Sequence, residues 1–132
     1  MTATNTDIPY LVRPRIYIGD TIALGPGKID LLRLIDQTHS IAAAARTLNM
    51  PYKRAWLLID SLNLGFGRPV VSTASGGKGG GRTVLTSLGQ DLLTRYTALE
   101  ESINSASDKE IKALLALASE QEPVVSGKDI PD

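Results

Sequence analysis

The sequence predicts a mainly α-helical protein with a small β component. Helical spacing of apolar residues or helix-start signals mark five segments, whereas four short runs rich in β-branched residues flank glycine-containing turns. With 132 residues, of which 42% are hydrophobic and 21% charged, the chain can bury one core but not two comfortable ones. Aromatic residues make up only 5% of the chain, so the core must be built from aliphatic side chains.

The first half of the chain is expected to form a strand pair and three helices. The strands are 15–18 and 21–24, and the helices are about 28–37, 41–48 and 51–63. Gly19-Asp20 is a tight-turn dipeptide between the strands. Ser40 is a good N-cap for the second helix, and Pro51 suits the first position of the third because its missing N–H would be unpaired there anyway. The buried stripe of the third helix is expected to comprise Ala55, Trp56, Ile59 and Leu62.

The second half is expected to form a β-hairpin and two further helices. The strands are 70–73 and 82–85, and the helices are about 86–103 and 107–120. Thr86 caps the first of these helices, and Ser107-x-x-Glu110 is a capping-box signature for the second. From Gln121 onward the chain is polar and interrupted by proline and glycine, so we expect it to be disordered.

A strand pair, three short helices, a hairpin and a long helix follow one another in the order of a winged helix-turn-helix domain. In such a domain the second helix of the pair lies in the major groove of DNA, and residues at its N-terminal end reach the base edges. Here that end is Pro51-Tyr52-Lys53-Arg54, whose cations can donate to guanine or phosphate oxygens. The alternative is a solvated helix end that happens to carry a basic pair.

The loop between the two strands of the hairpin holds five glycines around one lysine, Lys78. Glycine lets the backbone approach a ligand closely, and Lys78 with Arg82 would supply charge for a phosphate or a minor groove. We therefore expect a wing that contacts DNA, the alternative being a flexible linker without a role. The residues expected to contact DNA are Ser40, Arg46, Pro51, Tyr52, Lys53, Arg54, Ser75, Gly76, Gly77, Lys78, Gly79, Gly80 and Arg82.

The same loop differs by one residue from a Walker A phosphate loop, with Arg82 in place of the lysine. That motif must open a helix, whereas Val84-Leu85 predicts a strand, so we expect no nucleotide-binding fold. The carboxylates form no recognisable acid–base pair, and the one histidine, His39, is expected in a turn without partners for a metal. We therefore expect no catalytic residue, no metal and no cofactor.

Charge is distributed unevenly although the formal net charge is zero. Residues 40–83 carry six cations against the single acid Asp60, whereas acids predominate from Glu100 onward. A basic middle favours a nucleic-acid partner, and ordinary charge scatter is the alternative. The absence of cysteine excludes disulfides, and Met1 to Asp7 lack a secretory signal, so a cytoplasmic protein is expected and no membrane partner.

The motifs also resemble a known family. The stretch Pro51-Tyr52-Lys53-Arg54-Ala55-Trp56, with Ile59, Leu62 and Asn63, resembles the recognition helix of the ModE-type molybdate-responsive transcriptional regulators. The stretch Ala74 to Gly81, then Val84-Leu85-Thr86 and Gly89, is similar to the wing and following helix of that family. The resemblance covers about Arg15 to Ile103. The helix from Ser40 to Leu48 is also similar to that of LysR-type regulators, which share the winged architecture.

The resemblance implies a homodimer that binds a palindromic operator of double-stranded DNA near molybdate-transport or molybdoenzyme genes. It places the DNA contacts at Tyr52, Lys53, Arg54 and, with its glycines, Lys78. Full-length family members have C-terminal β-barrel domains that bind molybdate, which this chain lacks, so we do not expect molybdate sensing by this chain alone. Arg54 stands where the family more often has a small residue, so the operator sequence does not carry over.

The expected organisation follows from these elements. Residues 11–103 would form the winged helix-turn-helix domain with its linker helix, 104–120 a C-terminal dimerisation helix, and 121–132 a disordered tail. The apolar stripe expected at the dimer interface comprises Leu92, Leu93, Tyr96, Leu99 and Ile103. A small-oxyanion (molybdate) binding protein and a winged-helix interaction module without DNA remain as alternatives.

Overall fold

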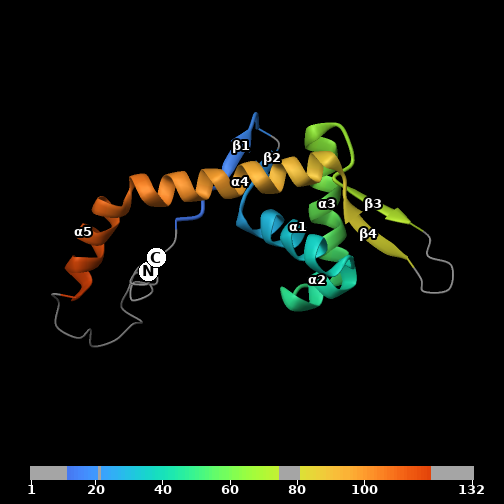
Figure 1. The fold of residues 1–132 in the computed structure, drawn as a ribbon, viewed down its shortest axis with the longest axis horizontal. Helices are drawn as coiled ribbons and strands as arrows, with labels where there is room; N and C mark the ends of the chain where they lie inside the picture. The colour runs from blue at the N-terminus through green and yellow to red at the C-terminus, as the bar shows by residue number, and fades with distance from the viewer. Residues whose placement is uncertain (1–11, 21, 75–80, 120–132) are drawn as a thin grey trace.

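The computed structural model describes residues 12–20, 22–74 and 81–119, and it confirms a mainly helical fold with a small β component (Figure 1). The elements in chain order are β1 (Ile16–Ile18), β2 (Ile22–Leu24), α1 (Pro26–Thr38), α2 (Ile41–Thr47), α3 (Tyr52–Phe66), β3 (Val71–Ala74), β4 (Arg82–Leu85), α4 (Ser87–Ala106) and α5 (Asp108–Ser119). The loop 75–80 and the predicted disordered tail 121–132 lie outside the described residues.

Several helix boundaries differ from those the sequence predicts: α1 begins earlier, at Pro26, α4 ends later, at Ala106, and both ends of α3 are shifted. Pro51 is the N-cap of α3 rather than its first residue, with an extended backbone at φ −63° and ψ 146°. The helix also continues past Asn63 to Phe66 and ends at Gly67, whose φ of 73° is a left-handed conformation that glycine adopts at low cost. Phe66, four residues after Leu62, continues the apolar stripe and packs against the core in this last turn.

The strands form two separate antiparallel pairs. In the first, Ile16 lies opposite Leu24 and Ile18 opposite Ile22; in the second, Val71 lies opposite Leu85 and Ala74 opposite Arg82. The β3–β4 pair projects from the body of the molecule (Figure 1), whereas β2 of the first pair packs against α3.

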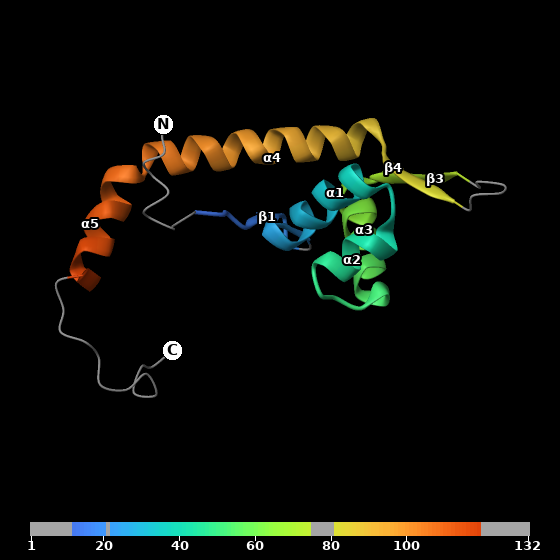
Figure 2. The same cartoon turned by 60° about the horizontal axis from the view of Figure 1, so that its bottom comes forward.

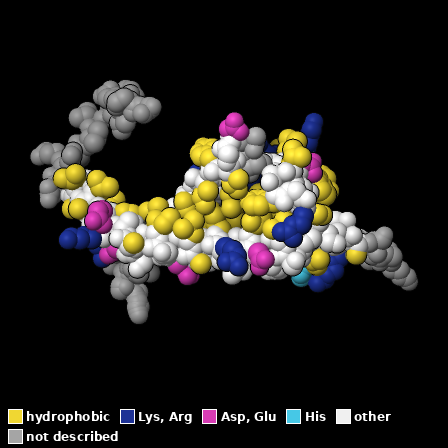
Figure 3. All heavy atoms as spheres, turned by 90° about the horizontal axis from the view of Figure 1, so that it is seen from above, with side chains coloured by type: hydrophobic (Ala, Val, Ile, Leu, Met, Phe, Trp, Pro, Cys, Tyr) yellow, Lys and Arg dark blue, Asp and Glu magenta, His cyan; other side chains and the backbone are white. Residues whose placement is uncertain are grey.

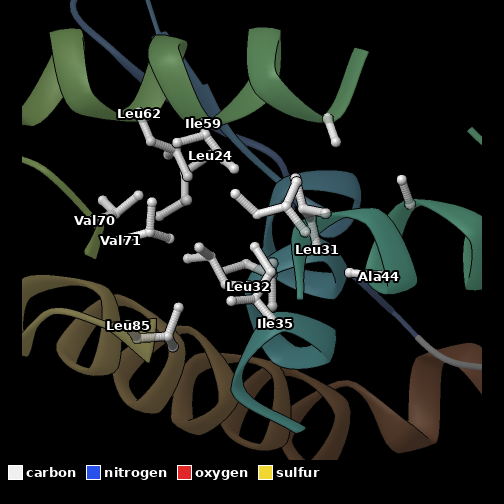
Figure 4. Close-up of a cluster of buried hydrophobic side chains, with 14 of the residues drawn as sticks. Leu24, Leu31, Leu32, Ile35, Ala44, Ile59, Leu62, Val70, Val71 and Leu85 are labelled. Carbon is white, nitrogen blue, oxygen red and sulfur yellow. The ribbon is translucent and has the colours of Figure 1, made fainter. Parts of the chain in front are cut away.

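The core is centred on α1. Its residues Ile29, Leu31, Leu32 and Ile35 are fully buried, because α1 is covered by α2, α3, α4 and β4. Figure 4 shows Leu31, Leu32 and Ile35 in one cluster with Ile59 and Leu62 of α3 and with Val70, Val71 and Leu85 near the hairpin. An aliphatic core was expected, and among the buried residues that the structure describes Tyr96 is the only aromatic one.

Helix α4 is long and runs past the body, and α5 leaves its far end at an angle (Figures 1 and 2). None of the helices that the structure describes is long and apolar enough to span a membrane. Helix α5 begins where the capping-box signature predicted, although the Ser107 hydroxyl donates back to the carbonyl of Ile103, 2.6 Å away.

The segment before β1 is tied to α1 and α4 by a cluster of charged side chains. Arg13 makes ion pairs with Asp30 of α1 at 2.6 Å and with Glu100 of α4 at 3.0 Å, and Arg33 contacts the same two carboxylates. These hydrogen bonds raise the pKa of the Arg13 guanidinium above its ordinary value. The cluster is partly buried, so it fixes the position of α4 more firmly than an exposed pair would.

The residues Pro69 and Val70 connect α3 to the hairpin and to α4. The amide of Val70 donates to Asn63 Oδ1 at 2.8 Å, and its carbonyl accepts from the amide of Thr86 at 3.0 Å. The Thr86 hydroxyl donates to the carbonyl of Pro69 at 2.8 Å and also caps α4 by accepting from the Gly89 amide. Gly89 packs so closely here that a Cβ atom on it would lie 2.3 Å from the Val70 carbonyl oxygen.

This close approach predicts a large effect for Gly89→Ala. The added methyl group would force the Val70 carbonyl away from α4, which we expect to lower the free energy of unfolding by about 1–3 kcal/mol, as overpacking does elsewhere. Urea denaturation followed by circular dichroism measures this change. Gly27→Ala is the matched control, because a Cβ there meets no atom within 4 Å; equal stability of the two variants would contradict the proposed packing.

Candidate nucleic-acid interface

Helices α2 and α3 form a pair joined by a short turn. The Ser40 hydroxyl caps α2 by accepting from the Ala43 amide at 3.0 Å, as the sequence predicts. The turn is closed by the amide of Met50, which donates to the carbonyl of Ala45 at 3.0 Å, and Asn49 adopts a φ of 58° that asparagine tolerates. Pro51 then forms the N-cap of α3, and the first-turn amides of Arg54 and Ala55 donate to its carbonyl.

The N-terminal end of α3 is exposed and basic. Tyr52, Lys53 and Arg54 are all exposed, and Tyr52 keeps 54% of its surface open. Ala55, Ile59 and Leu62 bury the opposite face of the helix, as predicted, so the basic residues cannot turn inward. Trp56 was expected in the same buried stripe but is only half-buried, because it lies at the side of the helix in edge-to-face contact with Tyr52.

On one side of α3 a hollow of about 230 Å³ separates it from the hairpin. Its walls combine the start of α2, the first turns of α3 and the base of the hairpin, and they include Ser40, Tyr52, Trp56 and Arg82. Three residues that the sequence assigned to DNA contact, Ser40, Tyr52 and Arg82, are thereby brought to one surface although 42 positions separate Ser40 from Arg82.

His39 joins this surface to the hairpin. It lies in the expected turn with a left-handed φ of 60°, and its carbonyl accepts from the Thr83 amide at 3.0 Å. Its ring Nε2 lies 3.4 Å from Arg82 Nη2, so a neutral imidazole can accept from the guanidinium. No sequence pattern predicts this contact, which depends on β4 packing against the end of α1.

On the other side of α3 a second hollow, of about 250 Å³, separates it from β1 and the start of α1. Arg54 lines it together with Arg15, from the residue before β1, and Lys28, from the first turn of α1. Met50 and Leu58 supply its apolar part. Sequence analysis missed Arg15 and Lys28, because only the fold brings them next to Arg54.

The remaining predicted contacts are dispersed or outside the described residues. Lys53 is exposed at the start of α3 without lining either hollow, and Arg46 is exposed near the end of α2. Pro51 is exposed as the N-cap of α3. The wing residues Ser75, Gly76, Gly77, Lys78, Gly79 and Gly80 lie outside the part of the chain that the structure describes.

The predicted apolar stripe of α4 divides into two parts. Tyr96 is 2% exposed and donates its hydroxyl hydrogen to the carbonyl of Pro14, so this side chain belongs to the core of its own chain and presents almost no surface to a second subunit. Burial also raises the pKa of its hydroxyl. Leu92 and Leu93 are half-buried against the core, and Leu99 and Ile103 keep intermediate exposure farther along α4.

Residues 12–20, 22–74 and 81–119 contain no candidate metal-binding site. No three side chains of histidine, cysteine, aspartate or glutamate gather there in a group that could hold an ion. The chemistry available at the surface around α3 is therefore hydrogen-bond donation by cations, hydroxyls and helix-end amides, which suits anionic partners.

Comparison with known proteins identifies relatives of two kinds. The chain is 37% identical over 109 residues to the molybdenum transport protein ModE of Azotobacter vinelandii, and the match covers 83% of this chain and 39% of that protein. It is 39% identical over 83 residues to the DNA-binding transcriptional dual regulator ModE of Escherichia coli K12, covering 63% of this chain and 32% of that protein. It is 41% identical over 80 residues to the molybdenum-pterin-binding protein MopB of Rhodobacter capsulatus, covering 61% and 30%.

The similarity to ModE-type regulators predicted from the residues is thus confirmed. No protein-family model matches the chain. The chain spans only 30–39% of the length of these three relatives. They are named as regulators or as molybdenum transport or binding proteins.

The cap at Ser40 allows a direct test of how α2 is held. Ser40→Ala removes the hydroxyl that accepts from the Ala43 amide, and we expect a loss of about 1 kcal/mol in the free energy of unfolding without DNA present. Thr47→Ala in the same helix is the control, since its exposed hydroxyl only donates to a carbonyl already bonded within the helix. Guanidinium titration measures both variants, and an unchanged midpoint for Ser40→Ala would show that the cap contributes nothing.

Proposed function

We propose that this chain is a transcriptional regulator that binds double-stranded DNA through a winged helix-turn-helix domain. Residues 11–103 would form the domain with its linker helix, with α2 and α3 as the helix-turn-helix and the β3–β4 hairpin as the base of the wing. Helix α3 would lie in the major groove, which is wide enough to admit a helix.

The observation that carries this proposal is the exposed basic end of α3. Within the described residues, none of the ion pairs involves Lys53, Arg54 or Arg82, so their charge is available to a partner. Hollows with cationic walls flank the helix on both sides. A helix in the major groove runs between two phosphate backbones, and cations on both of its sides suit that environment.

The similarity to transcriptional regulators named ModE supports a role in transcription. A further relative is named a molybdenum transport protein, which supports genes of molybdate transport or molybdoenzymes as targets. The six wing residues from Ser75 to Gly80, Lys78 among them, are retained in the proposal as contacts to the DNA backbone.

We extend the proposal to a homodimer formed through α4 and α5. Helix α5 exposes Leu114, Leu115 and Leu117, with Leu114 65% exposed. Figure 3 shows hydrophobic side chains as a band along the molecule from the body toward α5. A second copy covering this face would set two recognition helices for half-sites about 34 Å apart, one turn of DNA, on a palindromic operator.

Relatives named molybdenum-pterin-binding proteins favour a second candidate, a protein that binds a molybdenum oxyanion. Titration with molybdate separates the two candidates if it is run with and without DNA. Saturable molybdate binding without any DNA binding would favour this second candidate.

Selection from a random pool of double-stranded DNA, followed by sequencing at two salt concentrations, tests the proposed function. A palindrome with half-sites one turn apart is the expected outcome. Salt-sensitive binding without an enriched site would instead indicate an architectural role. Absence of binding at both salt concentrations would refute the proposal and favour a protein-interaction module.

We expect replacement of the cations at the N-terminal end of α3 to weaken sequence-specific DNA binding. Lys53→Ala and Arg54→Ala should each weaken operator binding by about 1–3 kcal/mol if they read bases, whereas Lys78→Ala should weaken binding to all sequences and reduce the salt dependence. Fluorescence anisotropy with the selected operator and a scrambled duplex measures both effects. Lys109→Ala, an exposed lysine on α5, is the matched control. Affinities equal to that of the unaltered chain in all three variants would refute the assignment of α3.

The proposed dimer predicts that polar residues on α5 separate the subunits. The double variant Leu114→Ser/Leu117→Ser should sediment as a monomer at micromolar concentration, where the unaltered chain sediments as a dimer, because burial of apolar surface drives such association. Leu64→Ser, at an 82% exposed leucine of α3, is the control and should leave the dimer intact. A monomeric unaltered chain would refute this interface.

A further inference from the structure

We propose that the hollow between β1, the start of α1 and α3 is a binding site for a tetrahedral oxyanion, held by Arg15, Lys28 and Arg54. Arg15 precedes β1, Lys28 lies in the first turn of α1 and Arg54 in the first turn of α3, and the described residues that line the hollow include no carboxylate. Arg15 and Arg54 take part in none of the ion pairs among the described residues, so a dianion bound between them would gain the attraction of both charges.

The backbone supports the same chemistry. Gly25 and Gly27 line the hollow at the N-terminal end of α1, where helix amides point outward and the helix dipole favours negative charge. No described side chain caps this end, and the first turn holds no acidic residue. The Arg15 side chain lies over this end, because a Cβ on Gly25 would be 3.6–3.7 Å from three of its carbon atoms, the guanidinium carbon included.

The surroundings strengthen the attraction. Lys28 is half-buried, and its pKa is lowered first by burial and then by repulsion from Arg15 and Arg54. The groups that repel Lys28 are the guanidinium groups of Arg15 and Arg54, so the three cations of the site are close enough to interact electrostatically. Met50 and Leu58 form an apolar wall that excludes part of the water and weakens screening.

The size of the hollow selects a small ligand. At about 250 Å³ it is smaller than the roughly 300–1,000 Å³ of pockets for organic ligands, and it opens to solvent beside the basic end of α3. Guanidinium forks match the oxygens of phosphate-like anions, and lysine adds a point charge. Two sources supply this chemistry, a free oxyanion such as phosphate or molybdate and a phosphate of the DNA backbone.

Isothermal titration of the full chain with sodium molybdate and, separately, sodium phosphate tests the free-anion source, with sodium chloride at matched ionic strength as the blank. We expect saturable binding of one anion per chain, weakened roughly tenfold or more by Arg15→Gln and by Lys28→Gln, the loss expected for one charge-assisted hydrogen bond. Arg95→Gln, at an exposed arginine of α4, is the control and should bind as the unaltered chain does. Circular dichroism checks that each variant is folded.

The DNA source is tested by the salt dependence of binding to a duplex of random sequence. If the site takes a backbone phosphate, Arg15→Gln lowers the slope of log affinity against log salt by about 1, and free anions give no saturable heat. No anion binding together with an unchanged slope would overturn the site. If the unaltered chain binds an anion but no DNA, the proposed DNA-binding function is refuted and the oxyanion site is supported. If the chain binds DNA with a salt dependence that Arg15→Gln leaves unchanged, and binds no anion, the oxyanion site is refuted and the DNA-binding function is not.

Discussion

The hydrogen bonds of Val70 determine how the hairpin sits relative to the two helices beside it. Its amide is held by Asn63 near the end of α3, and its carbonyl is held by Thr86 at the start of α4. Gly89 lets α4 approach this carbonyl more closely than any side chain would permit. This one peptide therefore couples the orientation of α3, the direction of the hairpin and the path of α4. The shapes of the two hollows beside α3 depend on this arrangement.

Local signals were sufficient to predict most elements of the fold. Caps at Ser40 and Thr86 fall where hydroxyl residues precede apolar periodicity, because a cap depends only on the next three residues. The end of α3 was placed too early, because Gly67 rather than the apolar pattern terminates the helix. Pro51 was placed inside the helix by one residue, an error within the usual disagreement about helix ends.

The surface around α3 was predictable only in part. Tyr52, Lys53 and Arg54 share one helix end, so their common exposure follows from sequence spacing. The contacts of His39 with β4 and the approach of Arg15 and Lys28 to Arg54 depend on packing between elements far apart in the chain, for which a single sequence holds no signal. Trp56 shows the same limit, since helical register placed it near the core but could not show that the adjoining hollow leaves it half exposed.

The formal net charge of zero does not reveal the basic surface around α3, because some charges of the chain are ion-paired with one another and others are not. Asp30 and Glu100 are occupied by Arg13 and Arg33 in a cluster that fastens the N-terminal segment to α1 and α4. The two cations and two carboxylates of that cluster cancel in charge, whereas none of the ion pairs among the described residues involves Lys53, Arg54 or Arg82. At physiological ionic strength charges interact strongly only over about 8 Å, so an anion approaching α3 meets the local positive charge and not the sum over the chain. The affinity of this surface for anions therefore depends on how the acids are paired elsewhere in the fold, a property that composition does not contain.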